Sequence, residues 1–303
     1  MQLSVAIQEF DLSLAGVVAS GTRKLYLRRL HSLLDFLGDV EIEQITTSDL
    51  RRWRADLSER KERWVNNPYR PPAAGGLSPW TIHSHVRIAR QFFKWLIEEN
   101  YLSQNPAARL ELPPLPEEPP KAVAEEDLQR LLNAARDDPR NYALVCMLAD
   151  TAARVGAIAT LKLKDLDLEN RRALVWEKGR GGRKKAQYVF FSWRTREALI
   201  EYLRVRPDNA SDYLFISKRG GHLTPHAIYQ LLRRLARKAG ITGRFNPHAF
   251  RHGWARGALR NGADLGTVSD ILGHSSVEVT KRFYARWADG ELQERHDKFT
   301  WLK

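Results

Sequence analysis

The chain has few of the features that crosslink a protein or anchor it in a membrane. Its only cysteine among 303 residues is Cys146, which by itself can form neither an internal disulfide nor a zinc site. Cys146 lies in the apolar run ALVCMLAD, where we expect a buried side chain in a reducing compartment. No stretch approaches about 18 uninterrupted apolar residues, and the first residues, MQLSVAIQEF, lack the basic start of a signal peptide. These absences predict a cytoplasmic protein without a membrane partner.

Acidic residues are also in deficit. The chain has 36 Asp and Glu residues against 49 Lys and Arg residues, which gives a formal charge of +13. Basic proteins gain affinity for nucleic acid because binding releases counterions from the phosphates. No amphipathic anchor stands apart from the folded pattern, so nucleic acid is favoured over a membrane surface. The length and the 43% hydrophobic content fit two globular domains.

Residues 1–110 have the periodicity of short basic helices. Leucines recur at helical spacing over residues 22–37, with Arg and Lys between them. A second basic helix is predicted to begin near Thr47 or Ser48, and Ser78 followed by Pro79 predicts the start of a third. Such a helical module is typical of nucleic-acid binding, although a solvated helical bundle stays open as an alternative.

A proline-rich segment follows this module. Residues 111–121, ELPPLPEEPPK, favour an extended and fairly stiff conformation. We therefore predict a linker between a first domain over residues 1–110 and a second over residues 122–303. A hinge at this position would let the two domains close around a nucleic-acid duplex.

The second domain mixes helices with a few strands. Apolar periodicity predicts helices over residues 124–135, 140–153 and 223–239. Between the second and third of these, DLDLE, RALVWEK and QYVFFS alternate as strands do, and the basic, Gly-rich link between the last two predicts a hairpin turn. The link is not a nucleotide-binding P-loop, because the Lys-Ser/Thr pair is absent. The expected fold class is mainly α with a small antiparallel β-sheet.

The residues best suited to chemistry on a phosphate are gathered between residues 247 and 284. Arg251 can grip two phosphate oxygens through its planar fork, while His248 and His274 can donate hydrogen bonds or move protons near neutral pH. Tyr284 offers a hydroxyl that could attack phosphorus. His252 lies within the same helical turn as His248 and Arg251, so at least two of these three share a face.

This order of residues resembles a motif of the tyrosine recombinases, also called phage-type integrases. His-x-x-Arg, then Leu-Gly-His, then a tyrosine ten residues later is similar to their second catalytic motif. The segment TAARVGAIATL is similar to the first, which is approximately Thr-Gly-x-Arg-x-x-Glu-x-x-x-Leu. Ala152 replaces the usual Gly, and Ala157 replaces the acidic residue that normally helps to orient neighbouring groups. The resemblance implies that the catalytic residues are Arg154, Lys178, His248, Arg251, His274 and Tyr284.

The resemblance also implies an architecture and a reaction. It implies a helical, SAM-like core-binding domain over residues 1–110 and an α+β catalytic domain over residues 122–303. Tyr284 would attack the scissile phosphate and form a 3′-phosphotyrosine link, with His248 as a reasonable base and Lys178 protonating the leaving 5′ oxygen. No metal, ATP or other cofactor would be needed, because the link stores the bond energy.

The implied partners are double-stranded DNA and further copies of the chain. The recombinases act as a dimer on each site and as a tetramer in synapsis, and their C-terminal segment docks on a neighbouring subunit. Here Leu292, Phe299 and Leu302 lie close to one face of a predicted terminal helix. Docking of this tail in cis, on its own domain, stays open.

Three other functions stay open at this point. A type IB topoisomerase uses the same set of arginine, lysine, histidine and tyrosine residues, and exchange of strands between two marked duplexes would distinguish it from a recombinase. The absence of a carboxylate at Ala157 leaves room for a DNA-binding relative with weakened catalysis. A metal nuclease built on His248 and His252 is disfavoured, because no Asp or Glu accompanies that pair at metal-site spacing.

Overall fold

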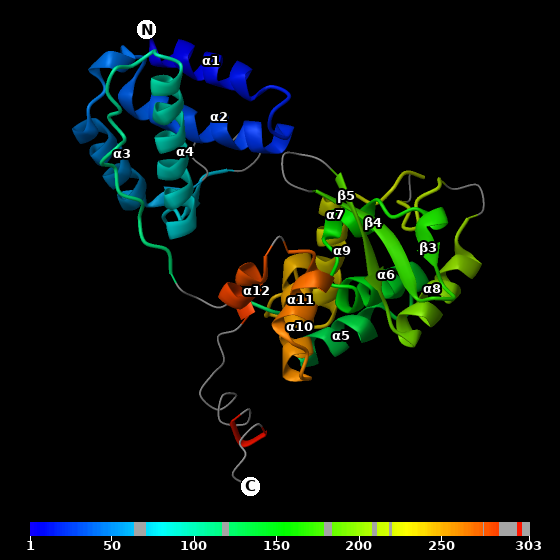
Figure 1. Cartoon of the computed structure of the whole chain (residues 1–303). Coiled ribbons are helices and arrows are strands. Elements are labelled where there is room, and N and C mark those ends of the chain that lie inside the picture. Colours follow the sequence, from blue (N-terminus) through cyan, green and yellow to red (C-terminus); the bar gives the residue numbers. More distant parts are fainter. Residues whose placement is uncertain are drawn as a thin grey trace. The chain divides into compact units, whose positions relative to one another are not determined.

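The computed structural model of the chain describes residues 1–63, 71–116, 121–178, 184–207, 211–217, 220–274, 276–284 and 296–298. The chain forms two compact units, one over residues 1–117 and the other over most of residues 118–303 (Figure 1). Among the described helices, none is long and apolar enough to cross a membrane.

The first unit is helical, as predicted. Its helices are α1 (Leu3–Leu14), α2 (Ser20–Leu37), α3 (Thr47–Glu59) and α4 (Pro79–Glu98). A short 3₁₀ turn, η1 (Ile42–Gln44), and a two-stranded ribbon of β1 (Glu62–Arg63) and β2 (Ala73–Ala74) complete its described elements. The helix α1 and the ribbon were not predicted.

Local signals explain where two of these helices begin. Thr46 caps α3 by accepting a hydrogen bond from the backbone N–H of Asp49, whose side chain bonds back to Thr46. Ser78 caps α4 by accepting a hydrogen bond from the backbone N–H of Thr81, with Pro79 at the first helical position, as predicted. The four helices enclose an apolar core that includes Phe10, Leu33, Trp53, Phe92 and Phe93.

The second unit combines helices with a three-stranded antiparallel sheet in the order β3-β4-β5. The strands are β3 (Leu166–Asp167), β4 (Arg172–Lys178) and β5 (Lys184–Phe190), preceded by the 3₁₀ turn η2 (Leu163–Asp165). The helices are α5 (Glu125–Ala135), α6 (Pro139–Asp150), α7 (Val155–Ala159), α8 (Trp193–Val205), α9 (Pro225–Lys238), α10 (Pro247–Arg260), α11 (Leu265–Leu272) and α12 (Val277–Tyr284). This composition confirms the predicted fold class.

The sheet has one buried face and one exposed face. Ala173 and Val175 of β4 and Val189 of β5 are buried, whereas Trp176 and Tyr188 are about half exposed. This alternation follows from the two-residue period of a strand. The buried face of β4 packs toward α7, so side chains at odd-numbered positions of β4 point to the helix that follows Arg154.

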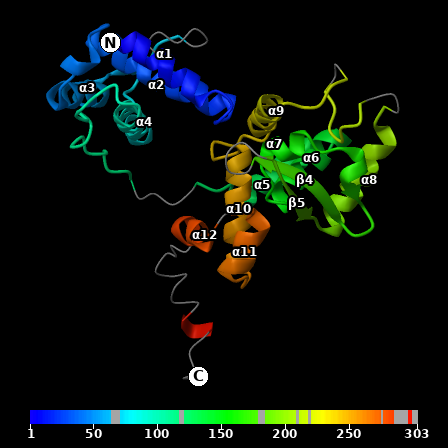
Figure 2. The ribbon, with the colours of Figure 1, turned by 45° about the horizontal axis from the view of Figure 1, so that its top comes forward.

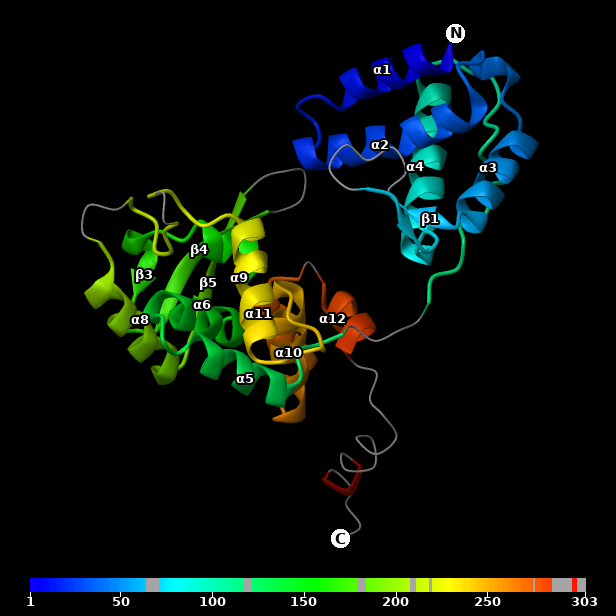
Figure 3. The same ribbon diagram turned by 180° about the vertical axis from the view of Figure 1, so that it is seen from behind.

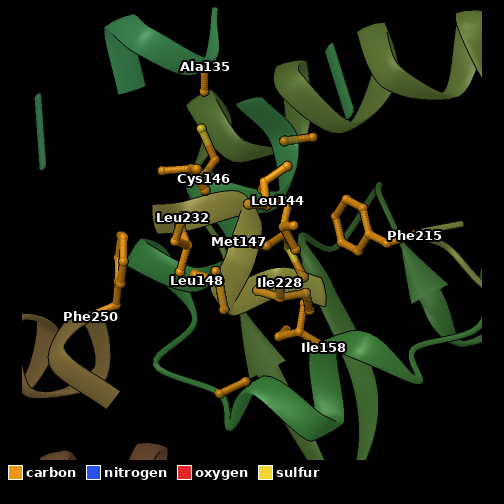
Figure 4. Packing of buried hydrophobic residues seen from close by; sticks show 14 of the residues in the cluster. Ala135, Leu144, Cys146, Met147, Leu148, Ile158, Phe215, Ile228, Leu232 and Phe250 are labelled. Carbon is orange, nitrogen blue, oxygen red and sulfur yellow. The ribbon is translucent and has the colours of Figure 1, made fainter. Parts of the chain in front are cut away.

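The core of the second unit is built around α6. This helix packs against α5, α7, α8 and α10, and α9 lies beside α5 (Figure 3). Leu144, Met147 and Leu148 of α6 meet Ile228 and Leu232 of α9 (Figure 4). Cys146 is buried in the same core, as predicted, and burial raises the pKa of its thiol to about 11.

A second, smaller apolar cluster lies among the last three helices. The helix α11 packs against both α10 and α12 (Figure 2). The buried members of the cluster are Ala152, Ala255, Leu259, Val268, Leu272 and Tyr284. Ala152 immediately precedes the loop that carries Arg154, so this cluster joins the two sequence motifs in one place.

Candidate active site

The helix α10 carries three of the polar residues of the site. Asn246 caps it by accepting a hydrogen bond from the backbone N–H of Ala249 at 3.0 Å, and Pro247 occupies the first helical position. The helix therefore begins immediately before His248. Arg251 and His252 follow one turn later, three and four positions along the helix.

Among the arginines of the site, Arg251 is the more deeply buried, with 6% of its surface exposed. Its Nη1 donates to the carbonyl oxygen of Ala152 at 2.7 Å, and its Nη2 donates to the carbonyl oxygen of Leu272. Leu272 is the last residue of α11, where the helix dipole favours a positive charge. Burial, and then repulsion by Arg154, lower the pKa of Arg251 to about 10. Arg251 therefore stays charged at neutral pH and holds the backbone at Ala152 and at the end of α11 in place.

Ala152 stands in the position where the resemblance implies a glycine, and its backbone explains that preference. Its φ of 53° lies in the left-handed region, which costs a non-glycine residue about 1 kcal/mol or more. The residue is fully buried against the cluster that holds Tyr284. The hydrogen bond from Arg251 to its carbonyl helps to hold this backbone conformation.

Arg154 is placed by the start of α7 and by a carboxylate from the sheet. It is the N-cap residue of α7, and its Nη1 forms an ion pair with Oε2 of Glu177 from β4. Its backbone N–H donates to the other carboxylate oxygen, Oε1, at 3.2 Å. Glu177 is 6% exposed. The sequence places Glu177 on an inward-facing strand position, but its pairing with Arg154 depends on how β4 packs beside α7.

Tyr284 is the last residue of α12 and is 4% exposed. Its hydroxyl and Nδ1 of His252 are joined by a hydrogen bond of 2.6 Å. Burial raises the pKa of Tyr284 to about 12, partly offset by the charge of Arg251. The phenol is therefore protonated at neutral pH. This hydrogen bond makes His252 part of the site, although its helical spacing from His248 and Arg251 did not predict a contact with Tyr284.

The two remaining predicted histidines are also held near the arginines. His274 follows Gly273, which ends α11 in the left-handed conformation, and its Nδ1 lies 2.8 Å from Oγ1 of Thr280. Burial, followed by repulsion from Arg251 and Arg154, lowers the pKa of His274 to about 4. The pKa of His248 is lowered by the same causes in the same order. Neutral histidines thus surround two charged guanidinium groups.

Two predictions fall partly or wholly beyond the described part of the chain. Lys178 is the last residue of β4 and pairs with Lys184 across the sheet. The predicted turn that follows it covers residues 179–183, which lie outside the described residues. The tail residues Leu292, Phe299 and Leu302 lie outside them as well, so the proposed terminal helix stays a prediction.

Comparison with known proteins identifies relatives over both units. Residues 121–291 match the phage integrase family, and residues 7–100 match the phage integrase N-terminal SAM-like domain. The tyrosine recombinase XerC of Bacillus licheniformis is 34% identical over 217 residues, which cover 68% of this chain and 70% of that protein.

Solved structures show the same fold at lower identity. The integrase of the Tn1549 transposon, in complex with a circular intermediate DNA, is 20% identical with a TM-score of 0.76, covering 99% of this chain and 100% of that one. A lambda integrase dimer bound to a core site is 16% identical with a TM-score of 0.70, covering 95% of this chain and 98% of that one.

The site predicts a loss of stability in mild acid. The pKa of His252 is lowered from 6.5 to about 4, mainly by burial and then by His248 and Arg251. Its contribution to stability is therefore complete above pH 6.5 and is lost as the pH falls toward 4, because the unfolded chain then binds the extra proton. His252→Gln removes this group, so the melting temperature of the variant should fall less between pH 6.5 and pH 4 than that of the wild type. We expect the difference to correspond to about 1–2 kcal/mol of unfolding free energy, because solvent partly screens a half-buried ring.

The matched control is His226→Gln, which changes an exposed histidine of α9. It should leave the pH dependence of the melting temperature unchanged. A His252→Gln protein with the wild-type pH dependence would show that His252 is not the titrating group.

Proposed function

Because the chain belongs to the phage integrase family and is a tyrosine recombinase, an enzyme that breaks and rejoins DNA strands, we propose that it acts at specific sites through a covalent link between Tyr284 and a 3′ phosphate. The observation that carries this assignment is the hydrogen-bonded pair of Tyr284 and His252 beside Arg251. Arg154 reaches the same site from α7, since its charge acts on His248 and His274.

The proposed step is an in-line displacement at phosphorus. The phenol oxygen of Tyr284 forms a bond to phosphorus while the bond from phosphorus to the 5′ oxygen breaks. A histidine takes the phenol proton, and Lys178 gives a proton to the leaving oxygen. The arginines Arg154 and Arg251 hold the non-bridging oxygens, whose charge grows in the transition state. Neither ATP, a metal nor another cofactor is required, because the phosphotyrosine conserves the bond energy for rejoining.

The geometry favours His252 over His248 as the acceptor of the phenol proton. With its proton on Nε2, His252 can accept from the Tyr284 hydroxyl through Nδ1, 2.6 Å away. The low pKa of His252 in the free protein makes it a weak base there. A bound phosphate adds negative charge beside the histidines and raises their pKa values. His252 would thus become an effective base only when DNA is bound. His248 and His274 would donate hydrogen bonds to the phosphate.

We propose double-stranded DNA as the partner of both units. The net charge of +13 supports this proposal, because each neutralised phosphate releases counterions. A dimer on each site and a tetramer in synapsis follow from the resemblance, and the lambda integrase structure is that of a dimer on a core site. We further propose a cytoplasmic location, where the substrate DNA of such an enzyme and a reduced Cys146 would be found.

The test of the nucleophile is Tyr284→Phe. A recognition duplex is first selected by repeated binding of the full chain to a pool of random duplexes, and is then nicked to trap cleavage. The variant should bind this duplex as the wild type does but form no SDS-resistant adduct, because it lacks only the attacking oxygen. An adduct on the Tyr284→Phe protein would place the nucleophile elsewhere.

Lys178→Ala tests the general acid. The variant should cleave an ordinary phosphodiester about 100-fold more slowly, but a 5′-bridging phosphorothiolate much less so, because a thiolate leaves without a proton. Single-turnover cleavage of both substrates measures the difference. Equal slowing would mean that Lys178 contacts only the DNA backbone.

The choice of base is tested by comparing His252→Ala with His248→Ala. Loss of the base should slow single-turnover cleavage by about 100-fold or more. It should also make the rate rise steadily with pH above neutrality, because the phenol must then ionise without help. We expect this profile for His252→Ala and the wild-type profile shape for His248→Ala. The reverse result would assign the base to His248.

A further inference from the structure

The helix α7, which follows Arg154, has no carboxylate of its own in its first turn. Arg154 is the N-cap of α7, and Ala157 is the third helical residue. In many helices an acidic side chain at this third position bonds back to the backbone N–H of the N-cap residue. Ala157 has no such group and is 3% exposed, in the apolar core. The N–H of Arg154 therefore needs an acceptor from elsewhere.

Glu177 supplies that acceptor from the neighbouring strand. Its Oε1 receives the backbone N–H of Arg154 at 3.2 Å, the bond that a carboxylate at the third helical position would make. Its Oε2 pairs with Nη1 of the same arginine. Both carboxylate oxygens thus bind one residue. A buried carboxylate is stable only with such partners, so the pair fixes Arg154 and Glu177 together.

We propose that Glu177 is a positioning residue, which replaces the carboxylate absent at Ala157 and holds the guanidinium of Arg154 toward the scissile phosphate. The inference rests on the proposed role of Arg154 in binding that phosphate. The ion pair engages Nη1, and a guanidinium has two further nitrogens with which to meet phosphate oxygens.

A carboxylate beside Arg154 also offsets the repulsion between the two arginines of the site. Arg154 and Arg251 are near enough for the charge of Arg154 to lower the pKa of Arg251. Without a carboxylate the two guanidinium groups repel each other in the free protein. The side chain of Arg154 is 38% exposed and can move toward solvent, whereas Arg251 is held by two carbonyls. Glu177 therefore keeps Arg154 in the site before DNA arrives.

The test moves the carboxylate from the strand back to the helix. Glu177→Gln, Glu177→Asp and the double variant Glu177→Gln with Ala157→Glu are compared in the full chain, on the selected recognition duplex. We expect Glu177→Gln to cleave about 10- to 100-fold more slowly at saturating protein, because a misplaced arginine weakens transition-state binding. Its affinity for the duplex should be unchanged. The double variant and Glu177→Asp should each recover most of the lost rate.

Glu169→Gln is the matched control, since it removes an exposed carboxylate beside the same sheet. It should cleave at the wild-type rate. The melting temperatures of all variants show whether a loss of rate comes from a misplaced Arg154 or from a less stable fold. The proposal is overturned if Glu177→Gln cleaves as fast as the wild type or faster. It is also overturned if the loss of rate only follows the melting temperature, or if Ala157→Glu does not restore the rate.

A second measurement does not depend on cleavage. Phenylglyoxal modifies free guanidinium groups, and mass spectrometry of the peptide that contains Arg154 gives the rate at that residue. Glu177→Gln should increase this rate severalfold, and the double variant should lower it again. Unchanged reactivity would overturn the inference. If the wild type forms no DNA adduct while reactivity changes as expected, the proposed function fails and the positioning contact stands.

Discussion

The buried guanidinium of Arg251 is the constraint on which the site depends. A charge removed from water costs several kcal/mol unless its donors are satisfied, and here the carbonyls of Ala152 and Leu272 accept from it. These carbonyls belong to segments 120 residues apart in the sequence, each adjacent to residues of the site. Placing Arg251 therefore fixes the loop of Arg154 and the helix end that carries His274 at the same time.

Much of this arrangement was predictable because it is encoded locally. Ser78 followed by Pro79 marked the start of α4, apolar periodicity marked α9, and alternation marked β4 and β5. The spacing of the two motifs selected Arg154, His248, Arg251, His274 and Tyr284. The charge of Arg251 acts on three of the others, His248, His274 and Tyr284. The position of Lys178 at the end of β4 also agrees with the sequence pattern, whereas its role stays a prediction.

The contacts that were missed depend on packing between distant elements. The alternation of β4 places Glu177 on the same buried face as Ala173 and Val175. It does not show that α7 and Arg154 lie against this face. His252 meets Tyr284 only because α12 packs on α11 within the small apolar cluster. A period of 3.6 or 2 residues fixes which face a side chain occupies, but not which element covers that face.

The pairing of Glu177 with Arg154 has a consequence for the sheet itself. Successive strand residues point to opposite faces, so a slip of β4 by one position would exchange every inward side chain for an outward one. A slip in one direction would put position 178, a lysine, opposite Arg154, and a slip in the other direction would put Trp176 there. Either shifted register would leave Arg154 without its carboxylate, so the ion pair with Glu177 favours the observed register.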